Sequence, residues 1–125
     1  MALATQQVVP IFRIFDEAKA REFYVGFLGF TVDWEHRFEP NAPLYMQVSR
    51  AGCVLHLSEH VGDACPGSTA FVRVTGLDAY HAELIAKNYK YNHPGLEIAP
   101  WNAKCMETID PFGNRLRFSE DLPKS

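Results

Sequence analysis

Aromatic and imidazole side chains recur at every second position in one stretch of the chain, the spacing that places side chains on one face of a β-strand. Trp34, His36 and Phe38 follow this spacing, and the charged residues Asp33, Glu35 and Arg37 lie between them. A flat aromatic pair can stack on a planar heterocycle, which contributes about 0.5–1.5 kcal/mol beyond burial. The spacing therefore predicts a surface for a planar ligand, or alternatively a face that packs on a helix.

Other side chains could line the same cleft from neighbouring strands. Tyr45 and Gln47 alternate along one apolar stretch, so they line either the cleft or a solvent-facing row. His56 lies between two leucines and faces away from them, as a packing residue or a ligand contact. Trp101 follows Pro100 outside a strong strand pattern, which favours the rim of a cleft over the core.

One acidic and one basic residue near the C-terminus could act together. Glu107 and Arg117 are expected on neighbouring strands, where an ion pair is the preferred interpretation and anion recognition by Arg117 the alternative. Glu107 could act as a general base, but the sequence does not identify a second catalytic residue that would act with it. The sequence also contains no nucleophile-elbow, HExxH or phosphate-loop motif. We therefore predict no catalytic residue.

Length and composition limit the class of protein. The chain has 125 residues, 47% hydrophobic and 22% charged, with a net charge of −3. This predicts one globular domain over residues 1–125, and the acidic balance disfavours a nucleic-acid partner. No run approaches the roughly 18 apolar residues of a membrane span, and residues 1–7 do not resemble a signal peptide. We expect no membrane partner, a cytoplasmic location and reduced thiols.

Hydrophobic periodicity divides the first half of the chain into one helix and four strands. The helix is expected between Asp16, a suitable N-cap, and Gly29, a suitable stop. Apolar or alternating stretches predict strands at 8–15, 31–38, 44–50 and 53–60.

The same order of elements returns in the second half, after a linker at 61–68. Strands are expected at 69–75, 96–101, 103–109 and 115–120, with a helix at 77–88 that begins in a sequence resembling a capping box, Thr75 to Asp78. Residues 110–114 read as a tight hairpin loop. The chain is therefore predicted to be α+β, with two βαβββ modules over about 8–60 and 69–120.

Four sequence motifs carry a resemblance to a known family. They are DEAKAREFYVGFLGF at 16–30, LHLS at 55–58, the pair Pro100-Trp101, and DPFGNRLRF at 110–118. Together they resemble the glyoxalase/bleomycin resistance/extradiol dioxygenase superfamily, which has the vicinal oxygen chelate fold, over about residues 8–120. The resemblance implies that the paired modules form a half-open β-barrel and that the protein is a homodimer.

The resemblance also allows a prediction about a bound metal ion. Metal-dependent members hold an ion at four positions, which correspond here to Val9, His56, Thr69 and Arg117. Only His56 can ligate a metal, because valine has no donor, threonine is a poor one and arginine adds a positive charge. The sequence therefore predicts no metal and no cofactor, and it leans away from an enzyme.

The pattern is closest in character to the bleomycin resistance subgroup. It implies a metal-independent protein that sequesters a bulky planar antibiotic or natural product, cationic drugs included, in a crevice between two protomers. The predicted ligand-binding residues are Trp34, His36, Phe38, Tyr45, His56, Trp101, Glu107 and Arg117. The alternative is a metal-dependent lyase or isomerase of the glyoxalase class, with a non-standard ligand set that includes His56 and draws on His36 and His60.

Overall fold

A computed structural model describes residues 2–123 of the chain. The first module contains β1 (Ile11–Arg13), α1 (Glu17–Arg21), η1 (Glu22–Phe27), β2 (Thr31–His36), β3 (Tyr45–Arg50) and β4 (Cys53–Ser58). The second contains β5 (Thr69–Arg73), α2 (Leu77–Ala86), β6 (Glu97–Ala99), β7 (Ala103–Ile109) and β8 (Arg115–Asp121). The α+β class and the doubled strand-helix-strand order are as predicted, although the strands β1 and β6 are shorter than expected.

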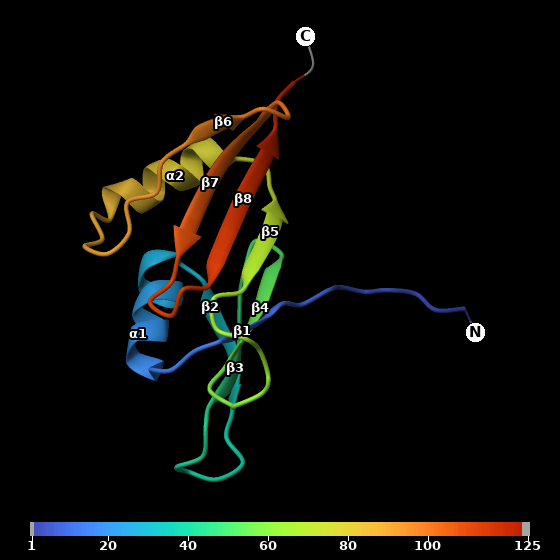
Figure 1. Cartoon of the computed structure of the whole chain (residues 1–125), viewed down its shortest axis with the longest axis vertical. Helices are drawn as coiled ribbons and strands as arrows, with labels where there is room; N and C mark the ends of the chain where they lie inside the picture. Colours follow the sequence, from blue (N-terminus) through green and yellow to red (C-terminus); the bar gives the residue numbers. More distant parts are fainter. Residues whose placement is uncertain (1, 124–125) are drawn as a thin grey trace.

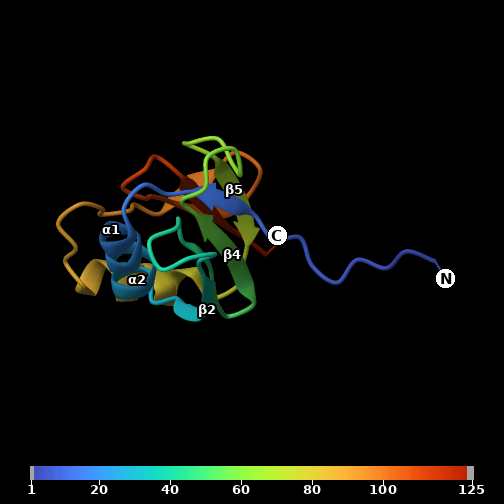
Figure 2. The same cartoon turned by 90° about the horizontal axis from the view of Figure 1, so that it is seen from below.

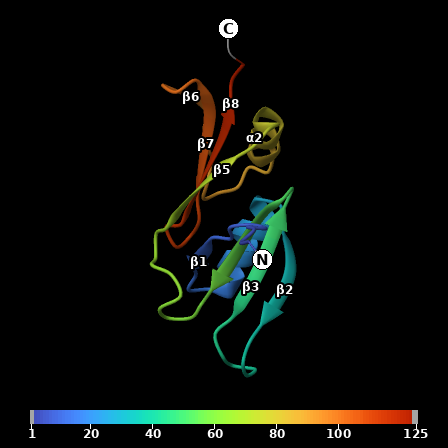
Figure 3. The ribbon, with the colours of Figure 1, turned by 90° about the vertical axis from the view of Figure 1, so that its right-hand side faces the viewer.

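Each module forms its own four-stranded mixed sheet. The strand orders are β1-β4-β3-β2 and β5-β8-β7-β6, and in both sheets the first strand runs parallel to the last strand of its module. The modules follow one another along the long axis of the molecule, with the second, yellow to red, above the first (Figure 1). In Figure 3, seen from the side, β5, β7 and β8 again lie above β1, β2 and β3. No strand pairing joins them among residues 2–123, so one copy does not close a barrel.

The first helix changes its winding part of the way along. Asp16 caps it as predicted, because its carboxylate accepts a hydrogen bond from the backbone N–H of Lys19 at 2.9 Å. From Glu22 the chain continues as a π-helix, in which the N–H of Leu28 reaches back five residues to the carbonyl of Phe23. This wider turn lies beside the second module, where the ring of Phe27 stacks on Tyr89 at 4.6 Å.

The second helix is capped in a different way from the prediction. Gly76, in the left-handed region at φ 77°, makes no side-chain cap, so the proposed capping box is wrong. Instead, the carboxylate of Glu120 on β8 accepts hydrogen bonds from the N–H groups of Gly76 and Leu77. A carboxylate at a helix N-terminus is favoured by the helix dipole. The capping group therefore comes from a strand more than forty residues away.

A buried polar network joins the two modules. Asp110, in the loop between β7 and β8, accepts hydrogen bonds from the hydroxyl of Tyr24 at 2.6 Å and from the side-chain amide of Asn114 at 2.8 Å. The same amide donates to the carbonyl of Arg13 at 2.8 Å. Burial raises the pKa of Asp110, and the hydrogen bonds from Tyr24 and Asn114 oppose that shift. Two of the motifs that carried the resemblance thus meet at the junction between the modules.

The core is continuous across that junction. Buried side chains of the first helix and sheet, such as Phe27 and Leu55, belong to the same apolar cluster as Leu84, Met106 and Phe118 of the second module. Residues 2–6, by contrast, extend away from the body as an arm (Figures 1 and 2), whereas Pro10 already accepts a hydrogen bond from the N–H of His56. No helix among residues 2–123 is long and apolar enough to cross a membrane.

Candidate ligand-binding site

The first module carries a cluster of aromatic side chains on one face of its sheet. Trp34 stacks on Tyr45 with an interplanar angle of 9° and a centroid distance of 5.9 Å. His56 meets the edges of both rings, at 5.2 Å from each. The rings of His36 and Phe38 are in edge contact at 4.7 Å, and His60 joins them at 5.9 Å from Phe38. The five predicted residues from Trp34 to His56 are therefore brought together.

Strand register explains why these rings share a face. Trp34 pairs with Gln47 and Gln47 pairs with His56, so the three side chains form one row across the sheet. The register shifts between Val32 and Trp34, which makes Asp33 the extra residue of a β-bulge. Strict alternation would have put Val32 and Trp34 on the same face, whereas the bulge re-aims the strand at the point where the aromatic cluster begins.

A chain of hydrogen bonds fixes the state of His56. The amide nitrogen of Gln47 donates to Asp33 at 3.0 Å, which turns the amide oxygen toward His56 Nε2, also at 3.0 Å. His56 Nε2 must therefore carry a proton and donate, and Nδ1 accepts from the hydroxyl of Tyr45 at 2.7 Å. Burial lowers the pKa of His56, which also favours the neutral ring. His56 is thus held as a neutral ring within the aromatic cluster.

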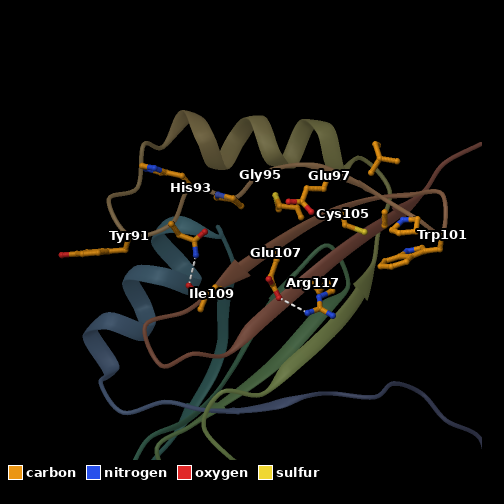
Figure 4. A pocket seen from close by; sticks show the side chains of 15 residues that line it. Tyr91, His93, Gly95, Glu97, Trp101, Cys105, Glu107, Ile109 and Arg117 are labelled. Atoms are coloured by element: carbon orange, nitrogen blue, oxygen red, sulfur yellow. Dashed lines mark hydrogen bonds and ion pairs between the residues drawn. The ribbon is translucent and has the colours of Figure 1, made fainter.

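The second module carries a cavity rather than an aromatic cluster. Its volume is about 620 Å³, and it lies between β6, β7, β8 and the 91–95 segment. Trp101, Glu107 and Arg117 line it, together with Glu97 and Cys105 (Figure 4). The indole of Trp101 is 60% exposed, which agrees with the predicted position at the rim. The remaining three predicted residues are therefore also brought together.

Glu107 makes the ion pair predicted from the sequence and a second one that was not foreseen. Its carboxylate accepts from Arg117 at 3.1 Å and from Arg115 at 3.4 Å. The alternation of β8 places Arg115 and Arg117 on one face, so this signal was present in the sequence. Gln47 and His60 are further members of the site that the predicted set of residues omitted.

The residues present do not fit the metal site of the metal-dependent members. Both ring nitrogens of His56 are used by Tyr45 and Gln47. In the parallel pairs, Ile11 lies opposite His56 and Phe71 lies opposite Arg117, so a shift of the alignment supplies no donor either. Within the described part of the chain, no three His, Cys, Asp or Glu side chains are grouped closely enough to hold an ion. No reaction step is therefore derived through a metal.

The predicted residues form two separate half-sites in one copy of the chain. Every residue that lines the cavity of the second module comes from positions 91–117. The aromatic cluster comes from positions 34–60. No contact between the two groups is found in the described residues. The sequence predicted one cleft, and the structure divides its walls between the modules.

Comparison with solved structures shows the same fold. A bleomycin-binding protein complexed with bleomycin aligns with a TM-score of 0.71 at 19% identity, over 94% of this chain and 100% of that one. A bleomycin resistance determinant encoded on the transposon Tn5 gives 0.71 at 18%, over 95% and 100%. TnmS3, an antibiotic-binding protein from Streptomyces sp. CB03234, gives 0.66 at 23%, over 98% and 99%. A search of curated proteins finds no match.

The two βαβββ modules give this chain the fold of the bleomycin-binding protein and of the bleomycin resistance determinant. The sequence model described as Glyoxalase superfamily protein matches residues 2–124. The chain therefore belongs to the glyoxalase superfamily.

Proposed function

We propose that this protein is a metal-independent binding protein that sequesters a bulky planar small molecule in a crevice between two copies of the chain. The observation that carries the proposal is the aromatic cluster. Trp34 on β2 and Phe38, two residues beyond its end, are 42% and 76% exposed, although both are large apolar rings. Exposed aromatic rings grouped on one face are typical of an interaction site.

The cluster is built to accept a flat ring system. Trp34 and Tyr45 are nearly parallel, and the hydrogen-bond chain through His56 holds Tyr45 in place before any ligand arrives. A pre-organised stacking surface loses little side-chain entropy on binding. Both ring nitrogens of His56, the imidazole that meets Trp34 and Tyr45, are engaged by Tyr45 and Gln47, so this histidine is part of the stacking surface.

The separation of the half-sites supports a dimer. In one copy no residue of the aromatic cluster lines the cavity of the second module. A second copy could set its cavity against the aromatic cluster of the first, and symmetry would then give two equivalent crevices. Exposed apolar side chains on the edge strands β1 and β5, Ile11 and Phe71, would be covered in such a dimer.

The relatives support the class of ligand. One solved relative is described as complexed with bleomycin and another as an antibiotic-binding protein. Both relatives are less than 25% identical to this chain, a likeness that shows a shared fold. Antibiotic binding by this chain is our proposal.

Isothermal titration calorimetry tests the function. Bleomycin and a panel of planar aromatic antibiotics are titrated into the protein, after its mass in solution has been measured by light scattering. We expect saturable binding of at least one planar compound at two per dimer, with an affinity about tenfold weaker in Trp34→Ala. A monomer, or no heat with any planar compound at high micromolar concentration, would contradict the proposal.

A complementation experiment tests whether the crevice is shared between copies. Trp34→Ala disables the aromatic cluster and Trp101→Ala disables the rim of the cavity, each on a separate chain with a different affinity tag. If each crevice combines two chains, the mixed dimer regains one intact crevice and binds one ligand. If each crevice belongs to one chain, the mixed dimer binds as poorly as the two parents.

A further inference from the structure

Two arginines share one carboxylate at the edge of the cavity of the second module. Arg115 and Arg117 project from β8 on the same face, and both guanidinium groups reach the single carboxylate of Glu107. The side chains of the two arginines are 46% and 47% exposed. One carboxylate can balance only one of these two charges, so the group formed by Arg115, Glu107 and Arg117 carries an excess positive charge. Arg117 and Glu107 line the cavity (Figure 4), and Arg115 lies beside them on β8, outside the lining.

Most of the hydrogen-bond donors of this pair have no acceptor. A guanidinium group carries five N–H donors, and each arginine uses one of them on Glu107 among the described residues. The contact of Arg115 at 3.4 Å is long for a hydrogen bond. The strand neighbours offer nothing further, since Arg115 lies between Thr69 and Ile109 in the sheet.

The other carboxylate of the cavity does not compensate for this excess. Glu97 lines the cavity from β6, opposite Cys105 in register, whereas Arg117 lies opposite Glu107. Figure 4 shows Glu97 apart from the Glu107–Arg117 contact. Glu97 has no ion-pair partner in the described part of the chain and is free to accept a donor from a ligand.

We infer that the ligand carries an oxyanion, a carboxylate or a group of the same planar shape, that binds Arg115 and Arg117 while its planar part stacks on the aromatic cluster. This inference rests on the proposed function and names the chemical class of its ligand. Guanidinium groups bind carboxylates through two parallel N–H···O bonds, so the pair provides both attraction and geometry. A strongly cationic drug would instead meet two arginines.

Three planar probes of the same size separate charge from shape: anthraquinone-2-carboxylate, its neutral carboxamide, and 2-(aminomethyl)anthraquinone. Calorimetry at low salt measures each dissociation constant with the full-length dimer. We expect the carboxylate to bind about tenfold more tightly than the amide, since charge-assisted bonds are roughly twice as strong as neutral ones, and the amine to bind most weakly.

Substitutions test whether the two arginines cause the preference for the carboxylate probe. Arg117→Gln should abolish the preference for the carboxylate and strengthen binding of the amine, and Arg115→Gln should act in the same direction. Glu107→Gln removes the competing carboxylate and should tighten binding of the anthraquinone carboxylate several-fold, which a purely structural ion pair would not do. Arg73→Gln is the matched control, because Arg73 pairs with Asp121 at 3.4 Å and lines a different cavity.

The outcomes are distinct. If the amide binds as tightly as the carboxylate, or if Arg73→Gln changes the preference as much as Arg117→Gln, the inference is wrong and the proposed function stands. If none of the three probes binds, the proposed function and the inference both fail.

Discussion

The two modules share one topology and differ in what they present on their exposed sheet faces. The face of the first is aromatic, and its polar groups satisfy one another from Tyr45 through His56 and Gln47 to Asp33. The face of the second is hollowed and charged, with arginine donors left over. A repeated backbone can therefore divide recognition into stacking by one copy of the motif and charge pairing by the other.

The largest effect is expected where the modules are joined. Asp110→Ala removes the acceptor for Tyr24 and Asn114 and leaves buried donors unpaired. Buried unpaired groups cost roughly 1–3 kcal/mol each, so we expect a loss of about 3 kcal/mol in the free energy of unfolding. Urea denaturation measures it. Asp78→Ala is the control, because its ion pair with Lys104 is exposed and should be worth less than about 1 kcal/mol.

Stacking in the first module is the next test. Trp34→Ala should weaken the affinity for a planar ligand by about tenfold, the equivalent of 1–3 kcal/mol per stacked ring. Val25→Ala, a half-exposed apolar residue of η1, should leave the affinity unchanged. Equal losses in the two variants, measured by calorimetry, would mean that stacking on Trp34 does not drive binding.

The two helix caps give a smaller contrast. Asp16 caps its helix from the adjacent position, and Glu120 caps the second helix from a distant strand. Each substitution to Ala should cost about 1 kcal/mol in global stability. Only Glu120→Ala should also increase hydrogen exchange at the N–H groups of Gly76 and Leu77 together with that of β8. Equal exchange changes in the two modules would contradict the distinction.

The smallest expected effect is on the titration of His56. Its folded pKa is lowered by burial, so the unfolded chain takes up a proton first as the pH falls. The stability contributed by neutral His56 is therefore present above about pH 6.5 and is lost on acidification. Tyr45→Phe removes a donor to Nδ1 and should raise the pKa of His56. NMR titration measures the pKa of His56; an unchanged value would show that the hydrogen bond from Tyr45 does not lower it.

Most of the fold could be predicted from local pattern. Local patterns distinguish a helix from a strand. They are the apolar residues at helical spacing between Asp16 and Gly29, and the alternation in the strands. The π-helical turn at Glu22–Phe27 and the bulge at Asp33 were not predictable, because both depend on how an element fits its neighbours. The same is true of the cap on the second helix.

Of the candidate site, the sequence alone determined which side chains could take part. It placed aromatic rings at alternate positions, supplied arginines at 115 and 117, and left His56 as the one metal donor among the four positions that hold the ion in metal-dependent members, because residue identity needs no folding to be known. Tertiary structure decided which of these side chains meet. Strand register made two arginines share one glutamate, and packing kept the aromatic cluster and the cavity apart, since contacts across many residues depend on how whole sheets are positioned.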